Sequence, residues 1–294
     1  MLPADIKRLH LDLTNNCNIK CPFCSRTKYL PHLDKKKPVD MDWCLISKRI
    51  KQIAGQLIHV SLCGTFGEPT LHPLILNIIQ WFREHTTAKL SIDTNGTTHN
   101  AAWWHKLATL GVHVCFSIDG TSSENYTKYR VGADLNTVMS HMTSFIDGGG
   151  KAEWQFIVFK SNEHEIETAK TLARTLGCKI IFKTSRNYKN SFSKPLEFNP
   201  LNNKCNTCKF VHRKELYIAH DRQVEFCCRY QPRYSDTTLE PKIEKLYLSQ
   251  LALFDLKHHE LQDVLRTPYF EFMEKFYFKF CKKYHLGNDS ELIT

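Results

Sequence analysis

Along the first 185 residues of the chain, segments with a strand-like pattern of hydrophobic and polar residues alternate with segments with a helix-like pattern. Short apolar or alternating runs, typical of strands, are followed by stretches whose apolar residues recur every three to four positions, as on one face of a helix. The predicted strands are Ile6–Leu13, Leu57–Cys63, Lys89–Ile92, Val112–Ile118, Glu153–Phe159 and Lys179–Phe182. The predicted helices are Met41–Ala54, His72–Phe82, Ala101–Leu110, Asn136–Ile146 and Glu163–Leu176.

This alternation of strands and helices predicts an α/β fold built on a parallel sheet. Six strand–helix units are too few to close into the eight-unit barrel, so we expect an open, curved, partial (βα)6 barrel. In sheets of this kind the functional groups lie at the carboxyl ends of the strands. The loops that follow the strands are therefore the places to expect ligand-binding residues.

The pattern changes near residue 185. Residues 186–204 are rich in Asn, Ser, Lys and Pro without periodicity, which indicates a linker or a loop across the barrel mouth. Two strand-like runs then occur at Glu215–Ala219 and Gln223–Phe226, and helical patterns at Leu246–Leu261 and Tyr269–Phe280. The predicted organisation is a partial barrel at 1–185, a linker at 186–204 and a small cysteine-rich α+β domain at 205–294.

Three cysteines, Cys17, Cys21 and Cys24, stand within eight residues in the loop after the first predicted strand. Thiols at this density suit a zinc ion or an iron–sulfur cluster better than an apolar core. A structural zinc site normally has four protein ligands, and the next candidates, His32 and Cys44, are distant. A cluster held by three thiolates leaves one iron open to another molecule. An open metal site is therefore the first functional hypothesis.

The motif Cys-x3-Cys-x2-Cys, with Phe23 before its last cysteine, resembles the cluster motif of the radical SAM superfamily. The resemblance implies a [4Fe–4S] cluster on Cys17, Cys21 and Cys24 whose open iron binds S-adenosylmethionine through its amino and carboxylate groups. Reductive cleavage of this cofactor would release a 5′-deoxyadenosyl radical. The resemblance also implies the (βα)6 core and an electron donor such as flavodoxin or ferredoxin.

A glycine-rich stretch, Cys63-Gly-Thr-Phe-Gly-Glu-Pro69, follows the second predicted strand. Glycines at a strand end let a ligand approach the backbone closely, and a neighbouring carboxylate can accept hydrogen bonds from an ammonium group. The stretch resembles the Gly-Gly-Glu-Pro motif of the same family, in a Gly-x-Gly-Glu-Pro form. This implies that Gly67 and Glu68 bind the amino group of S-adenosylmethionine. The alternative is an ordinary Gly/Pro turn with an exposed glutamate.

Polar residues also follow the third and fourth predicted strands. Asn-Gly and Asp-Gly pairs are common in turns, so each alone is weak evidence of a site. The family resemblance implies that Asn95 and Ser117 contact the cofactor. It also makes Asp119 and Arg130 candidates for the cofactor carboxylate or the substrate, and weak candidates for catalysis. A solvent-exposed arginine is the competing interpretation of Arg130.

A second group of cysteines lies in the last ninety residues: Cys205, Cys208, Cys227 and Cys281. Taken alone, four thiols would favour a small zinc module. After a radical SAM-like core, the segment resembles a truncated SPASM, or twitch, domain, which implies an auxiliary [4Fe–4S] cluster. Tyr284 stands where the family commonly has a last cysteine, so either Cys205 completes the ligand set or the cluster is open to substrate. Cys227 is preferred over the adjacent Cys228.

The remaining cysteines and several histidines are not expected to be ligands. Cys44, Cys115 and Cys178 lie within predicted helices or strands and are interpreted as buried apolar residues, whereas Cys63 borders the glycine-rich stretch and stays undecided. The histidines interpreted as surface residues are His59, His99 and His105.

The whole-chain composition narrows the class of protein. With 294 residues, 42% of them hydrophobic, the chain can bury a sizeable core. Twelve cysteines without a secretory leader favour metal binding over a disulfide framework. No apolar run approaches the length of a membrane span, so we expect a cytoplasmic protein without a membrane partner. The net charge of +10 favours anionic partners, although a plain solvated basic surface explains it equally well.

The predicted function is hydrogen abstraction by a radical, leading to oxidative modification of a peptide or an anionic small molecule. Two alternatives come from other classes: a zinc-binding nucleic-acid module and a non-catalytic iron–sulfur protein. The first would need basic and aromatic residues interleaved on one surface, and nucleic acid is not the expected partner. The Gly67–Glu68 motif argues against the second.

Overall fold

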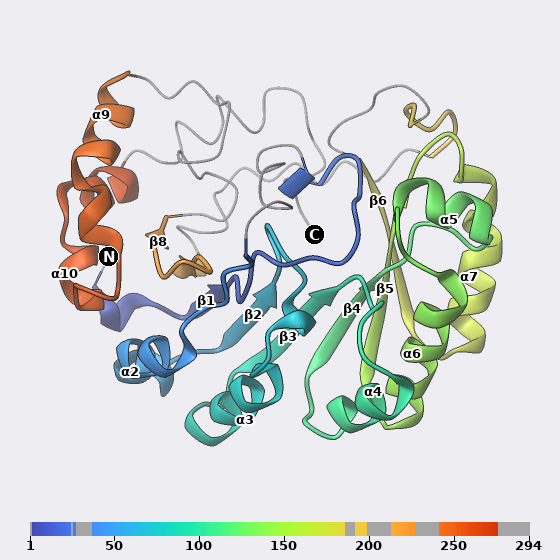
Figure 1. Cartoon of the computed structure of the whole chain (residues 1–294), viewed down its shortest axis with the longest axis horizontal. Coiled ribbons are helices and arrows are strands. Elements are labelled where there is room, and N and C mark those ends of the chain that lie inside the picture. The colour runs from blue at the N-terminus through green and yellow to red at the C-terminus, as the bar shows by residue number, and fades with distance from the viewer. Residues whose placement is uncertain are drawn as a thin grey trace.

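The computed structural model describes residues 2–24, 26–27, 37–185, 192–198, 213–226 and 241–275. These residues form one eight-stranded sheet with the strand order β6-β5-β4-β3-β2-β1-β7-β8. The sheet is curved, and the helices that alternate with the strands cover its outer side (Figure 1). The carboxyl ends of the strands therefore meet along one rim of an open half-barrel.

The six predicted strands are all present, and each pairs in parallel with its neighbours. The predicted α/β partial barrel is confirmed. The third strand extends beyond its predicted end at Ile92, which places Asp93 inside the sheet. The strands are β1 (Arg8–Leu11), β2 (His59–Cys63), β3 (Lys89–Thr94), β4 (His113–Ser117), β5 (Lys151–Val158) and β6 (Lys179–Thr184).

The two predicted strands after the linker form an antiparallel pair, β7 (Glu215–Ile218) and β8 (Val224–Glu225). Strand β7 also pairs in parallel with β1, from Arg8 opposite Glu215 to Leu11 opposite Ile218. The pair therefore extends the barrel sheet along its first strand. The domain boundaries at 185 and 204 stay a prediction.

Five helices follow the predicted pattern, and each presents an apolar face to the sheet. In α2, for example, Ile46, Ile50 and Ile53 are buried, and the Asp42 side chain caps the first turn by accepting a hydrogen bond from the Leu45 amide at 3.1 Å. The helices are α2 (Trp43–Ala54), α3 (Ile75–His85), α4 (Ala101–Ala108), α6 (Leu135–Asp147) and α7 (Ile166–Thr175). Short 3₁₀ turns lie at η1 (Pro3–Asp5), η3 (Pro69–Leu71) and η4 (Glu163–Glu165).

Two helix predictions are wrong in detail. The single helix expected at Leu246–Leu261 is divided into α9 (Pro241–Gln250), the 3₁₀ turn η5 (Leu251–Phe254) and α10 (Leu261–Leu265). The division occurs at Asp255, whose carboxylate accepts a hydrogen bond from the Lys257 amide at 2.9 Å and pairs with Arg222. The helix expected from His72 begins at Ile75, because η3 and a turn precede it. Of the last predicted helix, residues 269–275 are helical and the remainder lies outside the described residues.

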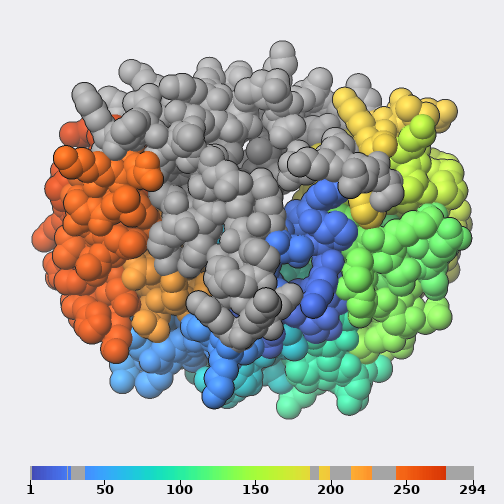
Figure 2. Space-filling view, turned by 45° about the horizontal axis from the view of Figure 1, so that its top comes forward, coloured from blue at the N-terminus to red at the C-terminus, as the bar shows by residue number. Residues whose placement is uncertain are grey.

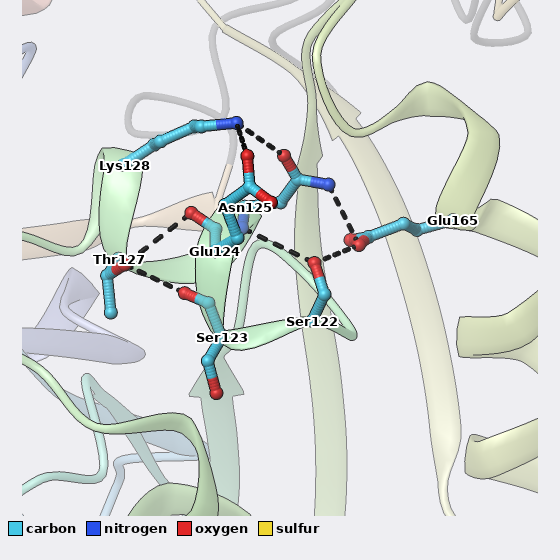
Figure 3. Close-up of polar contacts among 7 residues, drawn as sticks. All are labelled: Ser122, Ser123, Glu124, Asn125, Thr127, Lys128 and Glu165. Atoms are coloured by element: carbon cyan, nitrogen blue, oxygen red, sulfur yellow. Dashed lines mark hydrogen bonds and ion pairs between the residues drawn. The ribbon is translucent and has the colours of Figure 1, made fainter.

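One helix, α5 (Ser123–Tyr129), was not predicted. Its first turn is fixed by Glu165 of η4, whose carboxylate accepts hydrogen bonds from Ser122 Oγ at 2.5 Å and Asn125 Nδ2 at 2.9 Å (Figure 3). The Thr121 amide donates to the same carboxylate at 2.8 Å. A buried side chain from the next βα unit thus holds the start of α5, and the helix ends at Arg130.

The two faces of the sheet differ in chemistry. Side chains on the helix-facing side, such as Leu62, Ile92 and Val114, are buried in one continuous apolar core. The opposite, inner face is mostly polar, with His10, Ser61, Cys63, Ser91, Asp93, His113, Cys115, Ser117, Glu153 and Gln155. In the part of the chain that the structure describes, no helix has the length and apolar character needed to span a bilayer.

Candidate functional site

The three cysteines of the first motif lie in the loop that follows β1. Cys21 is buried, whereas Cys17 and Cys24 are partly exposed, and all three are free thiols. The Cys24 amide donates to the Cys21 carbonyl at 3.2 Å, which closes a tight turn. Cys17 is close enough to Cys21 and Cys24 for both to raise its pKa. The three predicted ligands therefore lie in one loop at the rim of the half-barrel.

Burial controls the protonation of Cys17 and Cys21. It raises the pKa of Cys17 to about 12 and that of Cys21 to about 11, so the metal-free protein holds neutral thiols there. Metal binding must then release protons. Among the described residues, no three His, Cys, Asp or Glu side chains are already converged as a metal site. Three neighbouring soft donors nevertheless fit an iron–sulfur cluster by their chemistry and proximity.

Asn95, at the end of β3, supports the cysteine loop. Its Nδ2 donates to Asn18 Oδ1 at 3.1 Å and lies 3.8 Å from Cys17 Sγ. Its Oδ1 accepts hydrogen bonds from the backbone amide and the hydroxyl of Thr97, at 2.9 and 2.6 Å. The amide group is therefore held in one orientation, with its NH₂ group toward Cys17 and Asn18.

Glu68 is buried, so the exposed-glutamate alternative does not hold. Oε1 of its carboxylate accepts hydrogen bonds from the hydroxyls of Thr70 at 2.7 Å and Thr94 at 2.6 Å, and Oε2 accepts one from the Asn95 amide at 2.7 Å. Its own amide donates to the Asn16 carbonyl at 2.7 Å. Burial raises the pKa of Glu68, and the hydrogen bonds oppose that rise. Glu68 thus joins the loops that follow β1, β2 and β3.

Gly67 lies against the backbone of the cysteine loop. A Cβ atom at this position would lie 2.0 Å from the Thr14 carbonyl oxygen, far inside van der Waals contact. Only glycine allows the two loops to approach so closely. The close packing of the two loops therefore explains why glycine occupies position 67, whichever ligand the loop binds.

Asp119 and Arg130 form a buried ion pair beside the cysteine loop. Arg130 Nε donates to Asp119 Oδ2 at 2.7 Å, and the other carboxylate oxygen accepts a hydrogen bond from the Ile157 amide at 2.6 Å. Arg130 Nη1 lies 3.8 Å from Cys21 Sγ. The arginine side chain is 11% exposed, which contradicts the interpretation of a solvent-exposed arginine.

The contacts of the other predicted ligands do not support a cofactor role or cannot be described. Ser117 lies half-buried at the end of β4, opposite Gln155 of β5, and among the described residues no hydrogen bond joins it to the cysteine loop. The second cysteine group, Cys205, Cys208, Cys227 and Cys281, lies outside the described residues.

The predictions for the remaining cysteines are confirmed in part. Cys44 is exposed on α2, so the prediction of a buried residue is wrong: the helix buries its other side through Trp43 and Ile46. Cys115 is buried as predicted, and Cys178 is partly buried. The predicted surface histidines His99 and His105 are exposed, whereas His59 is half-buried, with Nε2 3.2 Å from Ser91 Oγ.

Sequence reasoning missed a buried polar group beneath the glycine-rich loop. Asp12 accepts hydrogen bonds from Tyr217 Oη at 2.5 Å and the Thr65 amide at 2.7 Å, and burial raises its pKa to about 7. Tyr217 comes from β7, and no local signal links it to Asp12. Thr94, the partner of Glu68, could have been found, because it directly precedes Asn95 at a strand end.

These features define the class of the protein: an α/β half-barrel that carries a thiol-rich loop and a glycine–glutamate loop side by side at its carboxyl rim. The sequence model of the radical SAM superfamily matches residues 11–174, more than half of the chain. The chain belongs to the radical SAM superfamily. It is therefore a radical SAM enzyme whose cofactors are a [4Fe–4S] cluster and S-adenosylmethionine.

Curated relatives share parts of the chain. A tungsten-containing aldehyde ferredoxin oxidoreductase cofactor-modifying protein of Pyrococcus furiosus is 32% identical over 117 residues, which cover 39% of this chain and 31% of that protein. A probable GTP 3′,8-cyclase of Methanocaldococcus jannaschii is 24% identical over 236 residues, which cover 76% of each. The aligned part is thus under a third of the first relative and three quarters of the second.

Solved structures share the fold at low sequence identity. The structure described as native anSMEcpe with bound AdoMet and Cp18Cys peptide has a TM-score of 0.64 and 16% identity, covering 94% of this chain and 85% of that chain. Streptococcus suis SuiB bound to the precursor peptide SuiA has a TM-score of 0.66 and 14% identity, covering 93% and 67%. These neighbours are radical SAM enzymes with SPASM or twitch domains.

Proposed function

We propose that this enzyme uses S-adenosylmethionine to remove a hydrogen atom from a peptide or small-molecule substrate and so modifies it oxidatively. The observation that carries the proposal is the contact between two loops at the barrel rim. The Glu68 amide donates to the Asn16 carbonyl at 2.7 Å, which holds the Gly67–Glu68 loop against the loop of Cys17, Cys21 and Cys24. A cluster ligand set and a cofactor-binding loop would need this proximity.

The thiols of Cys17, Cys21 and Cys24 would hold the cluster in this proposal. When bound, the cluster supplies the electron that cleaves S-adenosylmethionine to methionine and a 5′-deoxyadenosyl radical. Glu68 Oε2 accepts one hydrogen bond, from the Asn95 amide, and so retains capacity to accept another from the cofactor ammonium.

Further roles follow from the contacts of the strand-end residues. We assign Asn95 two roles, orienting the cysteine loop and contacting the cofactor. Ser117, at the carboxyl end of β4, is assigned to contact the cofactor. Asp119 and Arg130 are assigned as positioning residues, because Arg130 is bonded to Asp119 and directed at Cys21. Neither is assigned to proton transfer with the substrate.

A twitch-type auxiliary [4Fe–4S] cluster on Cys205, Cys208, Cys227 and Cys281 is part of the same proposal. It is supported by structural likeness over more than nine tenths of the chain to enzymes that contain SPASM or twitch domains. Such a cluster could accept the second electron of an oxidation. The electron that starts the reaction would come from a donor of the flavodoxin or ferredoxin type.

The central test is formation of 5′-deoxyadenosine by anaerobically reconstituted protein with a chemical reductant. Wild type should form it, and Cys21→Ala should abolish it. Cys44→Ala is the matched control, because Cys44 is an exposed cysteine on α2 away from the site; it should retain full activity. Undiminished turnover by Cys21→Ala would refute the proposal.

The auxiliary cluster is tested by iron content. Replacing Cys17, Cys21 and Cys24 together by Ala should remove about four iron atoms per chain and leave about four, the content of one [4Fe–4S] cluster. Iron-free protein from this triple variant would contradict a second cluster. A colourless wild-type protein with bound zinc would instead favour a zinc module.

A further inference from the structure

Strand β7 is joined to the glycine-rich loop through the end of β1. Tyr217 Oη of β7 donates a hydrogen bond to Asp12 Oδ2 at 2.5 Å, and Asp12 Oδ1 accepts one from the Thr65 amide at 2.7 Å. Asp12 directly follows β1, and both Asp12 and Tyr217 are fully buried. A continuous chain of hydrogen bonds therefore runs from β7 to the loop that carries Gly67 and Glu68.

A second chain of contacts runs parallel to the first. His10 Nε2 lies 3.1 Å from Cys63 Sγ, and His10 Nδ1 lies 3.9 Å from Glu215 Oε1. The rings of His10 and Tyr217 also meet edge to face, with centroids 5.0 Å apart. His10 precedes Asp12 by two residues, so both side chains lie on the same face of the sheet. Both residues therefore connect β7 with the glycine-rich stretch that begins at Cys63.

The glycine-rich loop is folded so tightly that a contact at Thr65 affects the position of the whole loop. A Cβ atom at Gly64 would collide with the carbonyl group of Gly67, which shows that the backbone turns back on itself between these two glycines. Thr65 lies inside that turn. In a closely packed region, one residue cannot shift without moving its neighbours. A displacement of Thr65 would therefore be transmitted to Gly67 and Glu68.

Strand β7 is also part of the structure formed by the C-terminal portion of the chain. It pairs with β1 on one side and with β8 on the other, and Tyr247 of α9 donates to Glu225 of β8 at 2.9 Å. Residues 213–226, in amber, lie between the orange C-terminal helices and the light-blue segment that carries α2 (Figure 2). The hydroxyl of Tyr217 thus links this portion of the chain to the glycine-rich loop.

We propose that Tyr217 is a positioning residue for S-adenosylmethionine: its hydroxyl, acting through Asp12, holds the glycine-rich loop in the conformation that binds the cofactor. The inference rests on the proposed function, since it extends the cofactor-binding role assigned there to Gly67 and Glu68. A loop that spends less time in the binding conformation binds its ligand more weakly in the same proportion. Coupling between two sites is reciprocal, so cofactor binding should in turn stabilise the pairing of β7 with β1.

The test is the affinity of the reconstituted protein for S-adenosylmethionine, measured by equilibrium dialysis without reductant. Tyr217→Phe removes only the hydroxyl and should weaken binding about three- to tenfold, the range expected for one hydrogen bond. Tyr247→Phe is the matched control, because it removes the same kind of bond, from a buried tyrosine to the buried carboxylate of Glu225. Tyr247→Phe should bind the cofactor as wild type does, which separates a loss of positioning from a general loss of stability.

Variants of Asp12 test the middle of the hydrogen-bonded chain. Asp12→Asn keeps an oxygen for the Thr65 amide and offers an NH₂ group to the Tyr217 oxygen, so it should retain wild-type affinity within about twofold. Asp12→Ala removes both hydrogen bonds and should weaken binding at least as much as Tyr217→Phe does. Adding Tyr217→Phe to Asp12→Ala should have no further effect, because the bond through which the hydroxyl acts is already absent.

A spectroscopic measurement distinguishes positioning from damage to the cluster. At saturating S-adenosylmethionine, Tyr217→Phe should have the iron content of wild type and the same electron paramagnetic resonance signal after reduction. Only the cofactor concentration at the midpoint of the titration should shift, by the fold-change found in dialysis. Hydrogen exchange gives the reciprocal readout: the cofactor should slow exchange of Glu215–Ile218 in wild type, and less so in Tyr217→Phe.

Three results would each overturn the positioning role: wild-type affinity in Tyr217→Phe, equal weakening by Tyr247→Phe, or additive effects in the double variant. Cofactor binding does not require cofactor cleavage, so the two proposals fail separately. Weaker binding by Tyr217→Phe, in a protein that forms no 5′-deoxyadenosine, would refute the proposed function and leave the positioning role standing. Formation of 5′-deoxyadenosine by wild type, with unchanged affinity in Tyr217→Phe, would refute the positioning role alone.

Discussion

Single residues beside the cysteine loop are expected to adjust the chemistry of a cluster held there. Arg130 lies 3.8 Å from Cys21 Sγ, with Asp119 behind it, so the positive end of the ion pair is directed at the thiol. A nearby positive charge stabilises the reduced, more negative form of a cluster. Arg130→Met, which leaves Asp119 behind, should therefore lower the reduction potential, and Asp119→Asn should raise it, each by on the order of tens of millivolts.

The measurement is a redox titration of reconstituted protein followed by electron paramagnetic resonance, on the signal that changes when S-adenosylmethionine is added. Lys128→Met is the control, because Lys128 forms an exposed ion pair with Glu124 on the surface of α5. Shifts of the same sign in Arg130→Met and Asp119→Asn would contradict the electrostatic explanation.

Asp12 makes stability depend on pH. Burial is the main reason that its folded pKa is about 7 rather than the ordinary 3.8, with His10 Nε2 at 4.0 Å and Asp221 also nearby. Between these values the folded state keeps a proton that the unfolded state has lost, so the free energy of unfolding falls as pH rises. The fall is about 1.4 kcal/mol per pH unit and about 4 kcal/mol in all.

Asp12→Asn removes this dependence. Urea unfolding of the metal-free protein between pH 4.5 and 7.5 should show a shallower decline for the variant than for wild type, and the difference should level off above pH 7. Other buried carboxyls, such as Glu68 and Asp119, contribute equally to both proteins. Parallel declines would show that Asp12 does not keep its proton in the folded state.

Site residues could be predicted from the sequence where they stand in a short motif whose spacing indicates a metal-binding or cofactor-binding role. The thiols of Cys17, Cys21 and Cys24 and the pair Gly67–Glu68 each stand in a short motif, and the structure places both motifs at one rim. Contacts such as Tyr217 with Asp12 join residues 205 positions apart and leave no local pattern. They follow from strand order, which hydrophobic periodicity does not specify.

At the scale of elements, the start of helix α5 is stabilised by the carboxylate of one residue, Glu165. Glu165 is buried and accepts hydrogen bonds from the side chains of Ser122 and Asn125 (Figure 3). It also accepts one from the Thr121 amide. Glu165→Ala leaves these donors unsatisfied and should reduce the free energy of unfolding by about 2 to 3 kcal/mol. Glu167→Ala, in an exposed pair with Lys170, should change it by less than about 0.5 kcal/mol. Equal effects in urea unfolding would show that the Glu165 network adds no stability.

The loop after β2 depends on the absence of a side chain at Gly67. Gly67→Ala places a methyl group against the Thr14 carbonyl and should separate this loop from the cysteine loop. Binding of S-adenosylmethionine to reconstituted protein, measured by equilibrium dialysis, should weaken by roughly tenfold or more. Gly55→Ala is the control, since no atom lies within 4 Å of a Cβ there. Wild-type affinity in Gly67→Ala would contradict the steric explanation.

Element prediction succeeded where periodicity is strong and failed where polar side chains redirect the chain. The six strands and five long helices follow their apolar patterns. The pattern through Leu246–Leu261 is also helical, but Asp255 bonds to the backbone and to Arg222 and ends the turn η5. Helix α5 has few apolar residues, and its start is set by Ser122 and Glu165 rather than by periodicity.

At the scale of the whole molecule, β1 is an interior strand although it is the first in the chain. The Asp12 amide donates to the Ile218 carbonyl, and the Arg8 amide to the Lys214 carbonyl. Hydrogen exchange of the segment Arg8–Asp12 should therefore be as slow as that of β3. Strand β6, one of the two edge strands of the described sheet, is the comparison and should exchange faster. Exchange of β1 at the rate of β6 would show that β7 belongs to a separately fluctuating domain.

The pairing of β1 with β7 has a consequence during synthesis on the ribosome. Tyr217 and Asp12 are 205 residues apart, and chains elongate at about 5 to 20 residues per second. The first strand therefore waits about 10 to 40 s for its neighbour, with one edge unpaired and the adjacent thiols unprotected. Delivery of iron and sulfide to Cys17, Cys21 and Cys24 is best timed after translation has passed β7, when the strand that anchors them has both of its neighbours.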